Sequence, residues 1–149
     1  MSFYGSQVYL QGISAITATR GPADPVPGDV RVEDGIHYRY IYNAGGTTLA
    51  VGYACTVLAP SSTGYSATIS TAAGSILLGF CKHVAIPTTN YGWVAFKGYV
   101  PVVVGTTAAT NAVLQADANG VLAAAVTFPT VGVVNTTITS TGYANVYLA

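Results

Sequence analysis

Two long stretches of this chain, residues 40–81 and 118–149, contain no Asp, Glu, Lys or Arg. Seven of the ten charged side chains fall instead between Arg20 and Arg39. Charged residues normally keep the surface of a small domain hydrated; they make up about 25% of a typical globular protein. Here they make up 7%. We therefore expect a fold in which much of the surface is covered by other protein.

Length and net charge narrow the class of protein further. The 149 residues suffice for one domain with a buried core, and the formal net charge is zero. Such a chain has no basic field to attract phosphate backbones or anionic lipids, so we expect neither nucleic acid nor membrane as a partner. The start of the chain lacks the pattern of a secretory signal. We expect a soluble protein made in a cytoplasm.

From Ile36 onward the pattern is that of an all-β protein, either a single β-sandwich or a barrel. Short runs of β-branched and aromatic residues alternate with Gly, Asn, Pro and Ser. Residues 36–42 alternate cleanly, which places Tyr38, Tyr40 and Tyr42 on one face and His37, Arg39 and Ile41 on the other. We expect residues 43–46 to turn the chain and residues 47–58 to return as the partner strand of a hairpin.

The second half of the chain predicts further strands. Residues 75–86 should form a strand with one face made by Ile76, Leu78, Phe80, Val84 and Ile86. Residues 91–104 should form another, with one face made by Val94, Phe96, Val100, Val102 and Val104. Asp117-Ala118-Asn119-Gly120 is a strong turn signal that should join residues 112–115 to residues 121–127. Residues 130–139 and 143–148 should supply the last strands.

The first 35 residues differ from this β-domain. Residues 1–16 are uncharged and carry Phe3, Tyr4, Tyr9 and Leu10. Residues 21–34 contain three prolines among four acidic residues, and proline at that density prevents regular strand pairing. We expect residues 1–35 to form an extended N-terminal arm with a semi-rigid connector, and residues 36–149 to form the β-domain.

The sequence carries little that indicates chemistry. It has no phosphate-binding loop, dinucleotide fingerprint, zinc-protease motif or nucleophile elbow. Cys81 and His83 would share a strand face, but zinc needs three or four ligands, so we interpret Cys81 and Cys55 as buried apolar residues that are not paired in a disulfide. His37 lies near Glu33 and Asp34 in a loosely held charged segment. We expect no enzyme activity, no metal and no cofactor.

The tyrosine face of residues 36–42 leaves three uses open. The rings of Tyr38, Tyr40 and Tyr42 can pack in the core, contribute to a subunit interface, or stack on sugar rings if they are exposed.

Several segments of the second half resemble a known family when taken in order. They are residues 91–98 (YGWVAFKG), residues 111–120 (NAVLQADANG), residues 131–134 (VGVV) and residues 143–148 (YANVYL). This order is similar to that of the small all-β capsid decoration proteins of tailed bacteriophages, over residues 79–149. The first 78 residues match no family in this way.

The resemblance implies a structural role in a virion. Decoration, or cement, proteins sit as trimers on the outer face of the phage head and hold neighbouring major capsid subunits together. The resemblance thus implies the major capsid protein and copies of the chain itself, as a homotrimer, for partners. It implies a location on the outer capsid surface after assembly in the host cytoplasm.

The candidate partner-binding residues combine the apolar residues of the arm with the charged segment. They are Phe3, Tyr4, Tyr9, Leu10, Arg20, Asp24, Arg31, Glu33, Asp34 and Arg39. Charged residues at such a surface fix register and partner choice more than affinity. The first alternative is a tail, fibre or head-fibre module that binds host carbohydrate through exposed tyrosines. The second is a small β-fold hydrolase that depends on His37 or His83.

Overall fold

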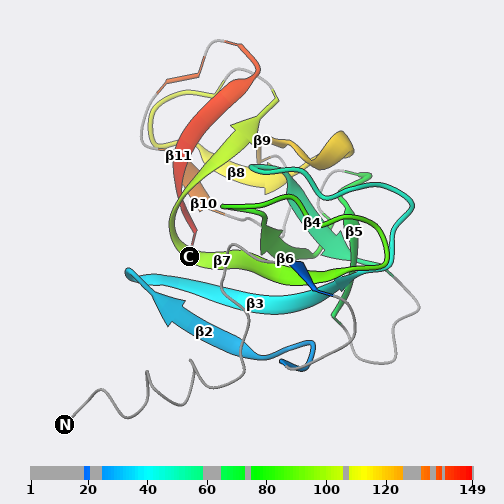
Figure 1. Cartoon of the computed structure of the whole chain (residues 1–149). Coiled ribbons are helices and arrows are strands. Elements are labelled where there is room, and N and C mark those ends of the chain that lie inside the picture. The colour runs from blue at the N-terminus through cyan, green and yellow to red at the C-terminus, as the bar shows by residue number, and fades with distance from the viewer. Residues whose placement is uncertain are drawn as a thin grey trace, which may run out of the picture.

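The computed structural model describes residues 19–20, 25–58, 65–72, 75–105, 108–125, 132–134, 137–138 and 140–148. The fold is all-β, as predicted, and its strands join in one eleven-stranded sheet (Figure 1). The strands are β1 Thr19–Arg20, β2 Val30–Glu33, β3 Ile36–Asn43, β4 Ala54–Val57, β5 Ser66–Ile69, β6 Leu77–Phe80, β7 Tyr91–Val104, β8 Val113–Ala116, β9 Leu122–Ala124, β10 Gly132–Val134 and β11 Gly142–Leu148. A 3-10 turn, Ala118–Gly120, separates β8 from β9. A search of these residues for a helix long and apolar enough to cross a bilayer finds none.

The sheet is not a single closed barrel, because two additional strand pairings, both made by β7, connect the middle of the strand order to its ends. It runs β11-β10-β8-β9-β7-β6-β4-β5-β3-β2, and β7 also pairs with β3 and with β11. The result is two rings that share β7: an N-terminal circuit of β3, β5, β4, β6 and β7, and a C-terminal circuit of β7, β9, β8, β10 and β11. A ring with an odd number of strands cannot be antiparallel throughout. One parallel pair therefore occurs in each, β3 with β5 and β7 with β9.

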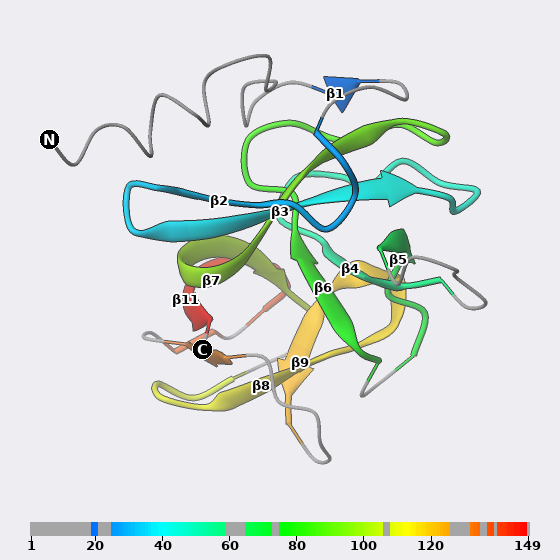
Figure 2. The same cartoon turned by 90° about the horizontal axis from the view of Figure 1, so that it is seen from below.

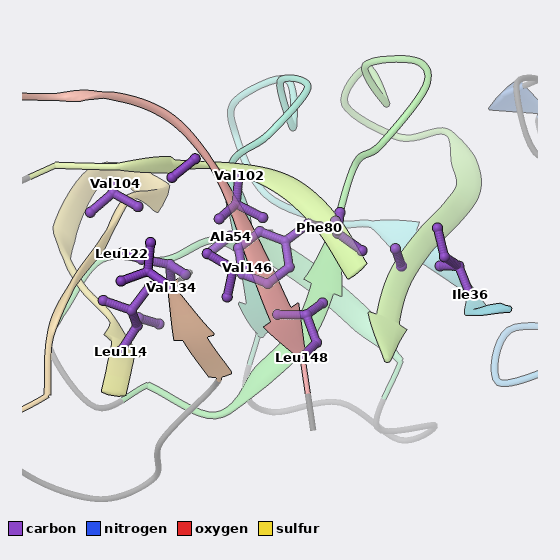
Figure 3. Close-up of a cluster of buried hydrophobic side chains, with 14 of the residues drawn as sticks. Ile36, Ala54, Phe80, Val102, Val104, Leu114, Leu122, Val134, Val146 and Leu148 are labelled. Atoms are coloured by element: carbon purple, nitrogen blue, oxygen red, sulfur yellow. The ribbon is translucent and has the colours of Figure 1, made fainter. Parts of the chain in front are cut away.

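Two buried clusters correspond to these circuits. The smaller takes side chains from all five strands of the N-terminal circuit and includes Ile41, Cys55, Ala67, Leu78 and Val94. The larger takes side chains from the C-terminal circuit and extends to Tyr38, Tyr40, Phe80 and Trp93 on the outside of the N-terminal circuit. Figure 3 shows valine and leucine side chains of the C-terminal circuit converging on Phe80 and Ala54. This second cluster holds the two circuits together.

Strand β7 changes its inward face between Ala95 and Gly98, so the prediction of one continuous face for residues 91–104 is wrong. Before Gly98 the larger cluster contains Trp93 and Ala95, whereas Val94 belongs to the smaller cluster. After Gly98 the larger cluster contains Val100, Val102 and Val104. Gly98 has a φ of +109°, a region that favours glycine, and its backbone passes close to Gly35. Just before Gly98 the register of β7 against β3 shifts, since His37 pairs with Lys97 and Tyr38 with Ala95, and the extra residue Phe96 shifts the alternation by one.

Strand β6 shows a similar irregularity. The predicted strand 75–86 is regular only over Leu77–Phe80, and the register with β4 shifts between Cys55 and Thr56. As a result Leu78 lies in the smaller cluster and Phe80 in the larger, although the sequence placed both on one face. A bulge of this kind inserts one residue and reverses the side of everything after it.

The predicted hairpin between residues 36–42 and 47–58 does not form. Strand β3 pairs with β2, β5 and β7, while β4 pairs with β5 and β6. The segment between them crosses to another part of the fold, where Leu49 bridges Ile86. The buried side chain of Asn43 supports this path by donating to the carbonyl oxygens of Thr47 and Ile86, both at 2.9 Å.

The turn predicted at residues 117–120 is confirmed. The backbone nitrogen of Ala118 donates to Asp117 Oδ1 at 2.8 Å, and Asn119 and Gly120 have φ values of 60° and 74°. Strands β8 and β9 pair antiparallel on either side. Strand β10 lies within the predicted segment 130–139, and β11 matches the predicted segment 143–148 apart from its first residue, Gly142.

A hairpin that the sequence analysis did not predict lies at the start of the sheet. Strand β2, Val30–Glu33, pairs with β3 through the two-residue turn Asp34-Gly35, whose φ values are 52° and 75°. Two positive φ values in succession are typical of the tight turn that Asp-Gly favours. The expectation that proline prevents pairing is therefore wrong for residues 30–33, because the last proline of the segment is Pro27. The sheet thus begins before the predicted boundary at Ile36.

Candidate interaction surfaces

The sequence-predicted partner residues divide into two groups. Phe3, Tyr4, Tyr9, Leu10 and Asp24 lie outside the described residues, and only the backbone of Arg20 is described. That backbone pairs with β7, since Thr19 lies opposite Gly92 and Arg20 opposite Tyr91. For these residues the assignment stays a prediction. The other four lie on the β2–β3 hairpin.

One face of this hairpin carries a charged group, in which the Arg31 side chain is 11% exposed. Arg31 Nη2 lies 3.2 Å from Glu33 Oε2, and the Glu33 side chain is 48% exposed. Asp34 is exposed at the turn. Within the described part of the sheet, β2 pairs with β3 alone, so these side chains lie along a sheet edge. We call Arg31, Glu33 and Asp34 the hairpin charges.

Arg39 lies on the opposite face of the hairpin. Its guanidinium carbon is 4.2 Å from the ring centre of Phe96 and 5.7 Å from that of Tyr65. His37 contacts the same Phe96 ring edge-on, with the ring centres 6.0 Å apart. The structure therefore does not bring Arg39 together with the hairpin charges. It holds the guanidinium against aromatic rings instead.

Tyr38 and His83 form a pair beneath the hairpin charges. The hydroxyl of Tyr38 and Nε2 of His83 are 3.1 Å apart. Burial raises the pKa of Tyr38 to about 12, and the negative charges of Glu33 and Asp34 add to the shift. Burial lowers the pKa of His83, and Lys82 lowers it further. Each of these shifts favours the neutral form.

The arrangements considered for a hydrolase or a metal site do not assemble. His37 contacts Phe96, whereas His83 contacts Tyr38, which points the other way from β3. Cys81 is buried in the smaller cluster while His83 is exposed, so the two do not share a face. No group of three or more His, Cys, Asp or Glu residues that could hold a metal occurs in the described segments.

The two cysteines are buried thiols. Both Cys55 and Cys81 are free thiols in the structure, and their burial confirms the prediction that they pack as small buried residues. Cys55 Sγ donates to the carbonyl oxygen of Gly79 at 2.9 Å. A side-chain hydrogen bond with Cys81, together with burial, raises the pKa of the Cys55 thiol well above its usual range.

The tyrosine face of β3 belongs to the core. Tyr38 and Tyr40 are buried, and the ring of Tyr40 lies 5.1 Å from that of Trp93. Tyr42 is half-buried against Tyr91, with ring centres 4.8 Å apart. Sugar stacking requires an exposed ring face, so the use of Tyr38 and Tyr40 for carbohydrate binding is wrong.

An exposed apolar surface, which the candidate list did not include, crosses the C-terminal circuit. Val113, Val133, Tyr147 and Tyr99 come from β8, β10, β11 and β7, and each is between 37% and 54% exposed. Strand register places them side by side, because Val133 pairs with Val113 and with Tyr147, and Tyr147 pairs with Tyr99. We call these four residues the tyrosine–valine row.

Part of the neighbouring surface is already covered. The hydroxyl of Tyr143 donates to the carbonyl oxygen of Val51 at 3.0 Å, and the backbone nitrogen of Val103 donates to the carbonyl oxygen of Gly52 at 2.8 Å. A loop of the N-terminal circuit therefore protects Val103, which is buried. The alternation of polar or tyrosine residues with small apolar ones in residues 143–148 indicates one exposed face of β11, but not which strands lie beside it.

Comparisons with known proteins give a likeness of fold. No family model matches the chain, and no curated protein matches it. Among solved structures, the N-terminal base of the head fibre protein gp8.5 of bacteriophage phi29 superimposes with a TM-score of 0.56. The superposition covers 75% of this chain and 94% of that chain, at 9% sequence identity. The protein thus has the fold of a phage head fibre base.

Proposed function

We propose that this chain is a structural protein of a bacteriophage virion, bound to the outer surface of the head. The observation that carries the proposal is the fold likeness to a head fibre base over three-quarters of the chain. The sequence resemblance to capsid decoration proteins over residues 79–149 supports the same location. In this role the protein stabilises contacts between major capsid subunits as a decoration protein, and it acts as a homotrimer.

The hairpin charges are suited to the contact with the capsid. They lie on an exposed sheet edge, and Arg31 is held toward Glu33 by their ion pair. Such charges specify orientation and register on a partner, while neighbouring apolar contacts supply most of the affinity. Val32, which is exposed on the other face of β2, supplies one such apolar contact.

Binding to heads that lack this protein tests the proposal. The heads come from the parental phage with the gene for this chain interrupted, and co-sedimentation measures binding. Neutralising the hairpin with Glu33→Gln and Asp34→Asn should weaken binding by about tenfold, equivalent to about 1.4 kcal/mol. The matched control is Asp117→Asn, which neutralises a carboxylate in the β8–β9 turn and keeps its acceptor oxygen. Failure of the wild-type protein to bind would reject the proposal.

The N-terminal arm is tested in the same assay. Removing residues 1–18 leaves the β1 backbone available to pair with β7. The truncated protein should therefore fold, and it should bind heads more weakly because the arm adds contacts across a subunit boundary. Full-strength binding by the truncated protein would show that the arm has no part in attachment.

The fold likeness favours one second candidate, the base of a head fibre. A fibre base also binds the head, but it carries a projecting element rather than joining capsid subunits. Electron cryomicroscopy of intact heads separates the two roles. A density confined to the capsid surface identifies a decoration protein, and a density that continues outward identifies a fibre base.

A further inference from the structure

We infer that the tyrosine–valine row is the surface through which copies of this chain associate with one another. The inference rests on the proposed function, because it names the surface that assembles the protein on the head. It is separate from the contact with the capsid. The row and the hairpin charges lie in different parts of the fold: Figures 1 and 2 both show β7 between the β2–β3 hairpin and strands β8 and β9.

The row is a continuous apolar surface on the outside of the C-terminal circuit. Four adjacent strands each contribute one exposed side chain in register, so the row extends across about 14 Å at the usual strand spacing. Two of the four side chains are tyrosines, which give a large rigid contact area and a polar tip. Asn145 is exposed on β11 two residues before Tyr147, on the same face of the strand, and supplies a polar edge. An apolar centre with a polar rim is the usual composition of a protein interface.

The charge of the surface restricts its occupant. Of the four strands that carry the row, β8, β10 and β11 contain no Asp, Glu, Lys or Arg, and β7 contains one charged residue, Lys97, two residues before Tyr99. A charged partner placed on the row would lose hydration without gaining an opposite charge, which is unfavourable. The occupant must therefore present an uncharged face of similar shape.

A second copy of this chain presents such a face. Outside residues 20–39 the whole chain has only three charged side chains, Lys82, Lys97 and Asp117. Two or three rows can meet without any repulsion between like charges, because none of their members is charged. Exposed faces of β-sheets pack with interdigitating side chains about 10 Å apart, as they do inside sandwich folds. Because its members are uncharged, the row can pack against a second copy of itself.

The mass of the purified full-length protein in solution tests this inference. Light scattering on a sizing column, at low and at high salt, should give a multiple of the 15.2 kDa chain that salt does not change. Tyr147→Lys places a charge at the centre of the row and should produce the monomer mass. The matched control is Ile76→Lys. Ile76 is 69% exposed, and it precedes β6 directly in the chain, in the N-terminal circuit rather than in the row.

Each outcome of this test is decisive. A wild-type protein that is monomeric at every soluble concentration overturns the inference, and so does a Tyr147→Lys protein with the wild-type mass or an Ile76→Lys protein that dissociates equally. Circular dichroism and thermal unfolding establish that the variants are folded. If Tyr147→Lys does not fold, Val113→Lys at the other end of the row takes its place.

The two proposals can fail separately. A protein that self-associates through the row but does not bind heads rejects the proposed function and leaves the inference standing. A monomer that binds heads does the reverse. A dimer that Tyr147→Lys dissociates supports the row as the contact and rejects the homotrimer.

Discussion

Asn43 is the residue on which the path between β3 and β4 depends most directly. Its buried amide donates to the carbonyl oxygens of Thr47 and Ile86 and accepts from the backbone nitrogen of Gly45. Asn43→Ala removes these three hydrogen bonds, although the carbonyl oxygen of Ile86 still accepts from the backbone nitrogen of Leu49 and the backbone nitrogen of Gly45 still donates to the carbonyl oxygen of Ala67. We expect the free energy of unfolding to fall by about 3 kcal/mol, measured by urea denaturation.

A second asparagine provides the control for this change. Asn145 is exposed on β11, and Asn145→Ala should alter stability by less than about 0.5 kcal/mol. Equal losses in the two variants would show that the hydrogen bonds of Asn43 contribute nothing specific.

Tyr38 gives a prediction about alkaline pH. Its pKa is raised from 10.0 to about 12 in the folded protein, mainly by burial, so the folded state keeps a proton that the unfolded state releases. The stability linked to this proton is fully present below pH 10 and is lost as the pH rises from 10 to 12. The free energy of unfolding of Tyr38→Phe should fall less steeply over that interval.

Urea denaturation of both proteins at several pH values measures the difference. Near neutral pH the variant should lose only the hydrogen bond to His83, about 1 kcal/mol. All other groups are the same in the two proteins and cancel in the comparison. Parallel loss of stability above pH 10 would contradict the assignment.

Among the strands, β7 depends on Gly98 more than on any residue with a large side chain. An added Cβ there would lie 3.0 Å from the carbonyl oxygen of Gly35 and 3.2 Å from Cα of Ile36, and the φ of +109° disfavours a side chain. Gly98→Ala should therefore destabilise the protein by at least about 2 kcal/mol. Gly46→Ala, where a Cβ meets nothing within 4 Å, should change stability by less than about 0.5 kcal/mol. Thermal unfolding of the pair measures both, and a tolerated Gly98→Ala would show that the shift in β7 needs no glycine.

Local signals in the sequence predicted the elements that depend on neighbouring residues. The alternation at residues 36–42 and the turn at residues 117–120 were identified correctly, because a strand face and a tight turn are determined within a few residues. The faces of residues 75–86 and 91–104 were assigned wrongly. A bulge at Leu78 in β6 and another at Phe96 in β7 each reverse the alternation, and both occur where a strand pairs with one that is distant in the chain.

The hairpin before Ile36 shows a different kind of error. The pair Asp34-Gly35 is a strong local turn signal, but the prolines that precede it led to an extended connector being predicted there. The prolines end at Pro27, three residues before β2 begins. Whether residues 30–33 could form a strand depended on where the prolines lie relative to them, not on how many prolines the segment contains.

At the scale of the whole molecule, the low charge of the chain predicted that a surface contacts other protein, but it did not predict where in the fold that surface lies. The apolar row is assembled from four strands between Tyr99 and Tyr147, and only strand register brings its members together. The tyrosines that the sequence made most visible, Tyr38 and Tyr40, are instead buried between the two circuits. A surface that depends on pairing across the sheet cannot be recognised from spacing along the chain.

Because both circuits share β7, neither can fold or evolve independently of the other. Neither circuit closes without β7, and that strand pairs with partners as far away as β3 and β11. The two halves should therefore unfold in one cooperative transition, and folding should be slow because its contacts join distant parts of the chain. Cutting the chain within β7 would leave no independently stable half. Neither circuit can be exchanged or lost as a module, so evolution can remodel only the loops and the exposed surfaces.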